Sequence, residues 1–286
     1  VGSLVNIGAP EGPNGAVYIG GKLRAYEAIN INSSESDTGM DVDLDYTGVL
    51  ETIDGSITFQ PTSGEIKGDL IAGGQGSDIT AVGHESITVK GKLQAHGDIS
   101  VTAGTDVQVD SESVRITPTS EILSTGGSGK ITLKGVNDVV VNGQVGPGST
   151  DLSLVQVTSE YGDILVAKEG GRIETGAQIN LLGHNVEVAG VLRSTRATAA
   201  AFDHEVSIDI DGTAIINGDI DVAGSMLISA DSGVNIYNTA LQTTAAGQRL
   251  NIESEGAIIL GQDDWGATLG AASKLTMETS DQINIQ

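Results

Sequence analysis

The sequence contains no cysteine, only 3% aromatic residues, and 14 basic against 38 acidic residues. Without disulfides, hydrogen-bonded stacking and an apolar core must hold the chain together. The formal net charge of −24 argues against a nucleic-acid partner, because binding phosphates requires clustered Lys and Arg. It argues equally against an anionic membrane surface. We interpret the acidic excess as a solubilising coat, or as a surface that takes up divalent cations.

Long apolar runs are also missing. No run approaches the roughly 18 residues of a transmembrane helix, so we expect no membrane insertion. The chain has 40 glycines beside abundant Val, Ile, Thr, Ser and Asn, which is the composition of strands and turns rather than of long amphipathic helices. Because 38% of the residues are hydrophobic and alternate with polar ones, the chain is a folded β-rich body and not a disordered acidic tail.

One short sequence pattern, which we call the phrase, occurs three times in the last sixty-odd residues. Each copy has two apolar alternations of three residues, separated by five polar or small residues. The copies are Met226–Ile228 with Val234–Ile236, Leu250–Ile252 with Ile258–Leu260, and Leu275–Met277 with Ile283–Ile285. They start 24 and 25 residues apart. A fixed period of this length indicates stacked supersecondary units.

The same phrase can be followed back to Ile79–Ala81, and a third, more variable apolar element lies between copies, as at Gly91–Ala95. Two constant strands and one variable strand, joined by Gly, Asn, Asp and Ser turns, predict an all-β, three-faced β-solenoid with rungs of about 24 residues. Ile and Val would point inward and the residue between them outward. A β-sandwich is the alternative. The strand segments are too short for it, and the five-residue spacer recurs too regularly.

We expect residues 1–286 to form a single rod, less regular over 1–63 and regular over 64–286. Insertions are expected at 33–48, 118–129 and 193–204, where variable function could lie. Arg193–Phe202 is the one segment that could form a short helix, and it is the only basic patch. The chain starts and stops without a cap, so we expect a piece of a longer rod, or a unit that self-associates end to end or side by side.

Three aspartates, Asp41, Asp43 and Asp45, superficially resemble a calcium-binding loop. The loop pattern asks for glycine after the third acidic position and glutamate at the twelfth, where this chain has Tyr46 and Thr52. If the residues between the aspartates point inward, the three carboxylates lie in a row on the outer face. They are our candidate for a divalent-cation site, with calcium as the one cofactor considered.

Trp265 lies in a turn-rich, acidic connection, so its indole is a candidate glycan contact, although packing against the rod explains it as well. The four histidines, at 84, 96, 184 and 204, are interpreted as turn residues. The sequence has no nucleophile elbow, metalloprotease helix or phosphate-binding glycine loop. We therefore expect no catalytic residues and no enzyme.

Two segments, Gly91–Ala103 and Gly218–Gly224, resemble the repeats of filamentous-haemagglutinin-type exoproteins, the large adhesins of two-partner secretion. This resemblance implies a right-handed parallel β-helix and a secreted or surface-exposed rod that serves attachment or matrix building. It carries over no binding residues. Gly64–Leu70 is also similar to the rungs of bactofilins, cytoskeletal β-helices that polymerise end to end.

Our leading hypothesis is the structural or adhesive shaft of a bacterial extracellular adhesin or surface filament, with a polysaccharide, a host cell or a neighbouring cell as its partner. Three alternatives stay open: a glycan- or cation-binding module of the biofilm matrix, a bactofilin-like polymer, and a polysaccharide-degrading β-helix enzyme. An enzyme of this kind would place carboxylates and basic side chains together on adjacent rungs.

Overall fold

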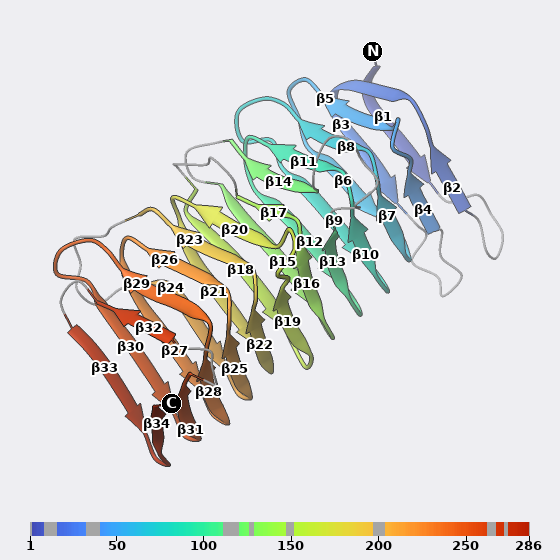
Figure 1. Cartoon of the computed structure of the whole chain (residues 1–286). Coiled ribbons are helices and arrows are strands. Elements are labelled where there is room, and N and C mark those ends of the chain that lie inside the picture. The colour runs from blue at the N-terminus through green and yellow to red at the C-terminus, as the bar shows by residue number, and fades with distance from the viewer. Residues whose placement is uncertain are drawn as a thin grey trace.

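The computed structural model describes residues 2–8, 16–32, 41–110, 120–125, 129–146, 152–196, 204–261, 267–271 and 274–285. Within these residues every regular element is a β-strand, 34 in all. Successive turns of the chain coil around one axis, so that each strand lies beside its counterparts in the turns before and after it (Figure 1). The pairs are parallel, and the predicted β-solenoid is confirmed.

Each turn runs through three faces in a fixed order, as the pattern of two constant strands and one variable strand predicted. Face 1 consists of β1 (Gly2–Gly8), β3 (Lys22–Asn32), β6 (Ile57–Gln60), β9 (Ile79–Gly83), β12 (Ile99–Ala103), β15 (Lys130–Gly135), β18 (Leu154–Ser159), β21 (Gln178–Gly183), β24 (His204–Ile210), β27 (Ser225–Ala230), β30 (Arg249–Ser254) and β33 (Lys274–Thr279).

Face 2 is a separate 12-stranded sheet. Its strands are β2 (Ala16–Ile19), β4 (Asp41–Leu44), β7 (Gly64–Ile66), β10 (Ile87–Val89), β13 (Val107–Asp110), β16 (Val139–Asn142), β19 (Asp163–Val166), β22 (Asn185–Val188), β25 (Thr213–Ile216), β28 (Gly233–Ile236), β31 (Ala257–Leu260) and β34 (Ile283–Ile285). Face 3 contains the first residues of β3 and then β5 (Val49–Thr52), β8 (Asp69–Ala72), β11 (Lys92–Ala95), β14 (Glu121–Ser124), β17 (Gln144–Val145), β20 (Arg172–Thr175), β23 (Val191–Ser194), β26 (Asp219–Val222), β29 (Thr239–Thr243) and β32 (Ala267–Gly270).

The three terminal copies of the phrase stack in vertical register. Their paired columns on face 1 are Met226, Leu250 and Leu275, and Ile228, Ile252 and Met277. On face 2 they are Val234, Ile258 and Ile283, and Ile236, Leu260 and Ile285. Apolar residues that recur at a fixed spacing in the sequence therefore occupy the same position on successive turns of the coil.

The interior is a continuous aliphatic column. In β12, Ile99 and Val101 are fully buried, while Ser100 and Thr102 between and after them face outward. The same alternation repeats in the strands of the other faces, because successive side chains of a strand point to opposite sides of the sheet. Phe59 is the bulkiest of the fully buried side chains, so aliphatic residues and not aromatic rings fill most of the narrow lumen.

Glycines stack at the corner between face 2 and face 3. A Cβ built on Gly91 would lie 1.8 Å from the carbonyl oxygen of Gly68, and one on Gly218 would lie 2.1 Å from that of Gly190. Contacts this short cannot exist, so the corner carbonyl of one turn occupies the space that a side chain in the next turn would need. These glycines are required for the close approach of consecutive turns.

Two intervals expected as insertions contain strands of the coil. Strand β14 lies inside 118–129, and its Ile122 is fully buried and pairs with Leu93. Strand β4 lies inside 33–48. The interpretation was wrong at β14, because one short apolar pair between glycine-rich and polar flanks lacks the length of the recognisable phrase. At β4 the inward positions of Val42 and Leu44 were anticipated.

The short helix expected over 193–202 is also wrong where the structure describes it. Arg193 and Ser194 end strand β23. The guanidinium of Arg193 points outward to Glu174 and Asp221 in the adjacent turns, at 3.3 and 3.5 Å, and the buried Ser194 hydroxyl donates to the carbonyl of Ala177 at 2.9 Å. Contacts between turns override the local helical preference here. Residues 197–203 lie outside the described residues.

The amino-terminal part of the chain is more regular than expected. Strand β3 turns one corner within its length, pairing with β5 through Lys22–Ala25 and with β6 through Ile29–Asn32. The described residues of this part, 22–32 and 41–63, therefore already follow the coil in register.

We expect removal of an interior side chain to destabilise the coil much more than removal of its outward neighbour. Ile228→Ala should lower the free energy of unfolding by about 2–5 kcal/mol, because it leaves a cavity in the lumen. The matched control is Leu227→Ala in the same strand, whose side chain faces outward and is only half-buried; it should cost about 1 kcal/mol or less. Urea unfolding followed by circular dichroism measures both, and equal losses would contradict the assignment of inside and outside.

Candidate functional site

The outer surface of face 2 carries a groove of about 360 Å³ across strands β16, β19, β22 and β25. Three outward aliphatic side chains, Val140, Leu165 and Ile215, line it together with Glu187. All four are half-buried. Its polar edge consists of Asp138, Asp163, Asn185 and Thr213.

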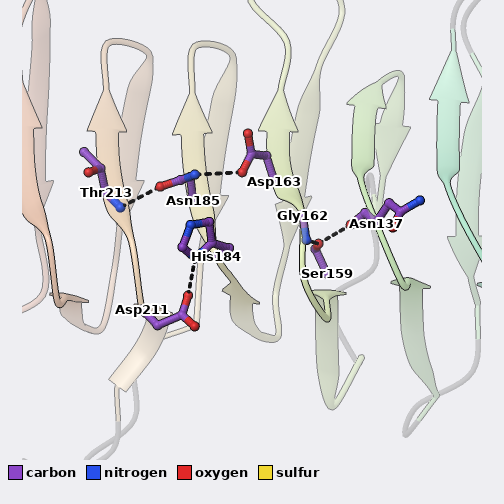
Figure 2. Close-up of polar contacts among 8 residues, drawn as sticks. All are labelled: Asn137, Ser159, Gly162, Asp163, His184, Asn185, Asp211 and Thr213. Atoms are coloured by element: carbon purple, nitrogen blue, oxygen red, sulfur yellow. Dashed lines mark hydrogen bonds and ion pairs between the residues drawn. The ribbon is translucent and has the colours of Figure 1, made fainter.

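This polar edge is a ladder of hydrogen bonds that runs from turn to turn, shown in part in Figure 2. The Asp138 carboxylate accepts from the backbone N–H of Asp163 at 2.9 Å. Asp163 in turn accepts from the Asn185 amide at 2.8 Å, and the Asn185 oxygen accepts from the backbone N–H of Thr213 at 2.8 Å. Each side chain thus satisfies a donor at the start of the next strand, where the backbone turns the corner.

Further polar contacts in Figure 2 lie at the turn between faces 1 and 2. Nδ1 of His184 lies 2.8 Å from the carboxylate of Asp211, and both side chains are largely exposed. The Ser159 hydroxyl donates to the carbonyl of Asn137 and accepts from the backbone N–H of Gly162 at 2.9 Å. Because the Ser159 proton is given to a carbonyl, this serine is held as a turn residue rather than as a nucleophile activated by a base.

A carboxylate held between two lysines lies on face 2 near the amino-terminal end. Burial alone would raise the pKa of Glu65, but hydrogen bonds from Lys67 and Lys90 outweigh it and lower that pKa. The two ammonium groups lie 2.6 and 2.7 Å from the carboxylate oxygens. The same hydrogen bond to Glu65, only partly offset by burial, raises the pKa of Lys67.

Two glutamates on face 3 are held in a similar way. The hydrogen bond from Lys22, with Arg24 nearby, lowers the pKa of Glu51. Burial raises the pKa of Glu174, but Arg172 and Arg193 reverse the direction, so that it is lowered. A general acid at neutral pH requires a carboxyl pKa shifted upward. These glutamates are shifted downward, which suits ion pairs that link adjacent turns.

The predicted cation candidate lies on β4 and the turn that follows it. Val42 and Leu44 are fully buried, so Asp41 and Asp43 face outward as expected. Asp45 follows the strand and accepts from the backbone N–H of Tyr46 at 2.8 Å.

The charge beside Asp43 is already partly balanced. Asp43 contributes to the raised pKa of Lys67, so a lysine ammonium lies near the place where a cation would bind. Within the described ranges no group of three or more His, Asp or Glu side chains is arranged to hold a metal ion. The calcium site at Asp41, Asp43 and Asp45 stays a prediction without a supporting arrangement of ligands.

The remaining candidates are placed only in part. Trp265, the candidate glycan contact, lies outside the described residues. His84, His96 and His184 are exposed in turns, as predicted, whereas His204 begins β24. The part of the chain that the structure describes contains no helix that could cross a membrane.

Comparison with known proteins does not assign this chain to a family. No protein-family model matches the chain, and neither a curated protein nor a solved structure matches it. Of the resemblance of Gly91–Ala103 to filamentous-haemagglutinin-type repeats, the parallel β-solenoid supports the β-helical repeat fold and nothing finer.

The groove on face 2 was missed in the sequence, although a signal was present. In most phrases the residue between two inward aliphatics is polar, but Val140, Leu165 and Ile215 are themselves aliphatic. Three such exceptions at the same place in nearby rungs predict an apolar patch on the outer face. The hydrogen-bond ladder at its edge has no such signal, because its partners are determined by how loops of different length align the turns.

The ion pairs of Glu65 predict a specific pH dependence of stability. The pKa of Glu65 in the folded protein lies below its unfolded value of about 4.3. The stabilisation is therefore fully present above about pH 4.3 and is lost as the pH falls through the lower, folded pKa. The difference in melting temperature between the natural protein and Glu65→Gln should be positive at pH 7 and should shrink below about pH 4.3.

The control for this experiment is Glu278→Gln, at an exposed carboxylate that makes no ion pair within the described residues. It should show no comparable stabilisation at pH 7. A difference for Glu65→Gln that stays constant from pH 7 to pH 3 would contradict the proposed role of Lys67 and Lys90.

Proposed function

We propose that this chain is a non-catalytic shaft segment of a bacterial extracellular adhesin or surface filament. The observation that carries the proposal is the aliphatic interior, which is continuous from turn to turn between β3 and β31 in the described residues. Every turn is hydrogen-bonded to the turns beside it along all three faces. Bending such a rod would strain many parallel bonds together, so the coil is suited to hold two ends apart.

The distribution of charge agrees with a passive shaft. Ion pairs such as Lys22 with Glu51, and Arg193 with both Glu174 and Asp221, link adjacent turns within one face. The carboxylates and basic side chains of these ion pairs neutralise one another. A polysaccharide-degrading site would instead direct them at a substrate held over neighbouring turns.

The resemblance to filamentous-haemagglutinin-type repeats supports a location outside the cell or on its surface. The acidic coat adds to this support, because a net charge of −24 keeps long rods soluble and apart at high local density. The partner in this proposal is a polysaccharide or another cell surface.

The proposal is tested by particle shape and by location. Negative-stain images of the purified chain should show elongated particles with a length on the order of 55 Å, from about eleven spacings of ~4.8 Å between the twelve described strands of face 1. Antibodies against the chain should label intact cells that produce it. Compact round particles, or labelling only after the cells are permeabilised, would contradict the proposal. A fall in the viscosity of an acidic polysaccharide solution on adding the chain would contradict the proposal that the chain is non-catalytic.

A further inference from the structure

Face 1 presents one row of side chains that contains no charge. The row consists of the outward residue at the same register position of every strand, and it runs the length of the face. We call it the hydroxyl–amide column. Its members are Asn6, Asn30, Thr58, Thr80, Ser100, Thr132, Gln156, Asn180, Ser207, Leu227, Asn251 and Thr276. All except Leu227 carry a hydroxyl or an amide group.

The corresponding rows on the other two faces are charged. The row on face 2 includes Asp43 and Glu65, and the row on face 3 includes Glu51, Glu174 and Arg193. In a chain with 52 charged residues among 286, that is 14 basic and 38 acidic, an uncharged row of this length belongs to one face alone. A solubilising coat does not explain it, because solubility would place charge on face 1 as well.

The neutral area is widest between β6 and β21. The second outward row of face 1 lies beside the hydroxyl–amide column and reads Gln60, Val82, Thr102, Lys134, Thr158 and Leu182 over these strands. Lys134 is the one charge in both rows over this interval, and it is paired with Glu160 at 2.5 Å. The side chains of both rows are half-buried, so they form a flat surface.

The hydroxyls in this area are free to bind a ligand. Those of Thr58, Thr80, Ser100 and Thr132 make no hydrogen bond to another described residue, and each can both donate and accept. Because they belong to adjacent parallel strands, they repeat at about 4.8 Å along the axis of the coil. The result is a straight, regularly spaced line of unused donors and acceptors.

We infer that face 1 between β6 and β21 binds an uncharged linear polysaccharide, an extended chain of β-linked hexoses that lies parallel to the axis of the coil. Sugar hydroxyls are both donors and acceptors, as are the side chains of the column. The rise per sugar in an extended hexose chain is similar to the rise per turn of the coil. Successive sugars therefore lie over successive turns. This binding specifies the polysaccharide partner of the shaft proposal, but it does not depend on the particle shape or the cell-surface location that the shaft proposal predicts.

The charges of the protein favour a neutral polysaccharide over an anionic or a cationic polymer. An anionic polysaccharide is repelled by the overall charge of −24. A cationic polymer would be drawn to the excess of carboxylates on the rest of the surface instead of to the neutral area. A neutral glycan meets only one ionised side chain in the two rows between β6 and β21, namely Lys134, whose charge Glu160 already balances, so little charge has to be stripped of water when the sugar binds.

Affinity electrophoresis of the full chain tests the inference. A soluble neutral β-glucan in the gel should slow the migration of the chain, and polygalacturonate, an anionic polysaccharide, should not slow it. Cellohexaose should compete with the β-glucan much better than cellobiose, because the longer chain reaches hydroxyls on more turns.

Two double variants separate face 1 from the rest of the surface. Thr80→Val with Thr132→Val keeps shape and strand preference but removes two hydroxyls of the column, and it should weaken binding about tenfold. The control, Thr88→Val with Thr213→Val, makes the same change on face 2 and should bind as the natural chain does. Melting curves show whether each variant is folded, and if the first is not, Ser100→Ala replaces it.

Several results would overturn the inference. These are no retardation by the neutral glucan, stronger retardation by polygalacturonate, or equal weakening by both double variants. A dimer in sedimentation experiments that Thr80→Val with Thr132→Val abolishes, without any effect of glucan, would assign face 1 to a second copy of the chain instead. A rod-shaped particle that fails to bind glucan overturns this inference and leaves the shaft proposal intact.

Discussion

The structure depends on vertical stacking of aliphatic side chains around one axis. A single turn cannot be stable, because burial of an aliphatic side chain contributes about 1.5–3 kcal/mol while ordering the backbone costs about 1–2 kcal/mol for every residue. Each turn therefore needs the turns beside it to close the lumen and to pair its backbone. Stability is shared between neighbours, as in other repeat architectures.

The same stacking determines the surface. Once Ile99 and Ile131 are paired inside, their outward neighbours Ser100 and Thr132 must also lie one above the other. Any residue type repeated at a rung position thus becomes a row along the rod. The glycine corners, the ladder through Asp163 and Asn185, and the hydroxyl–amide column are three rows of this kind with different chemistry.

The inward residues could be predicted from the sequence because alternation and period act on the same positions. Leu250 and Leu275 were placed in register for this reason, and the structure pairs them. Strand β14 could not be recognised, since it has one buried isoleucine between flanks that look like a loop. Contacts between turns, such as Asp163 with Asn185, depend on how loops of unequal length align the rungs, and spacing along the chain does not contain that information.

The most direct test of the stacking uses the absence of cysteine from the natural chain. Leu227 and Asn251 are paired outward residues of adjacent turns. Paired strands lie about 4.8 Å apart, within the Cα separation of about 4.4–6.8 Å that a disulfide allows. A variant with Leu227→Cys and Asn251→Cys should form an intramolecular disulfide on mild oxidation. The variant with Leu227→Cys and Glu253→Cys, two residues out of register, should form much less. Equal crosslinking of both variants, or crosslinking only of the second, would contradict the account.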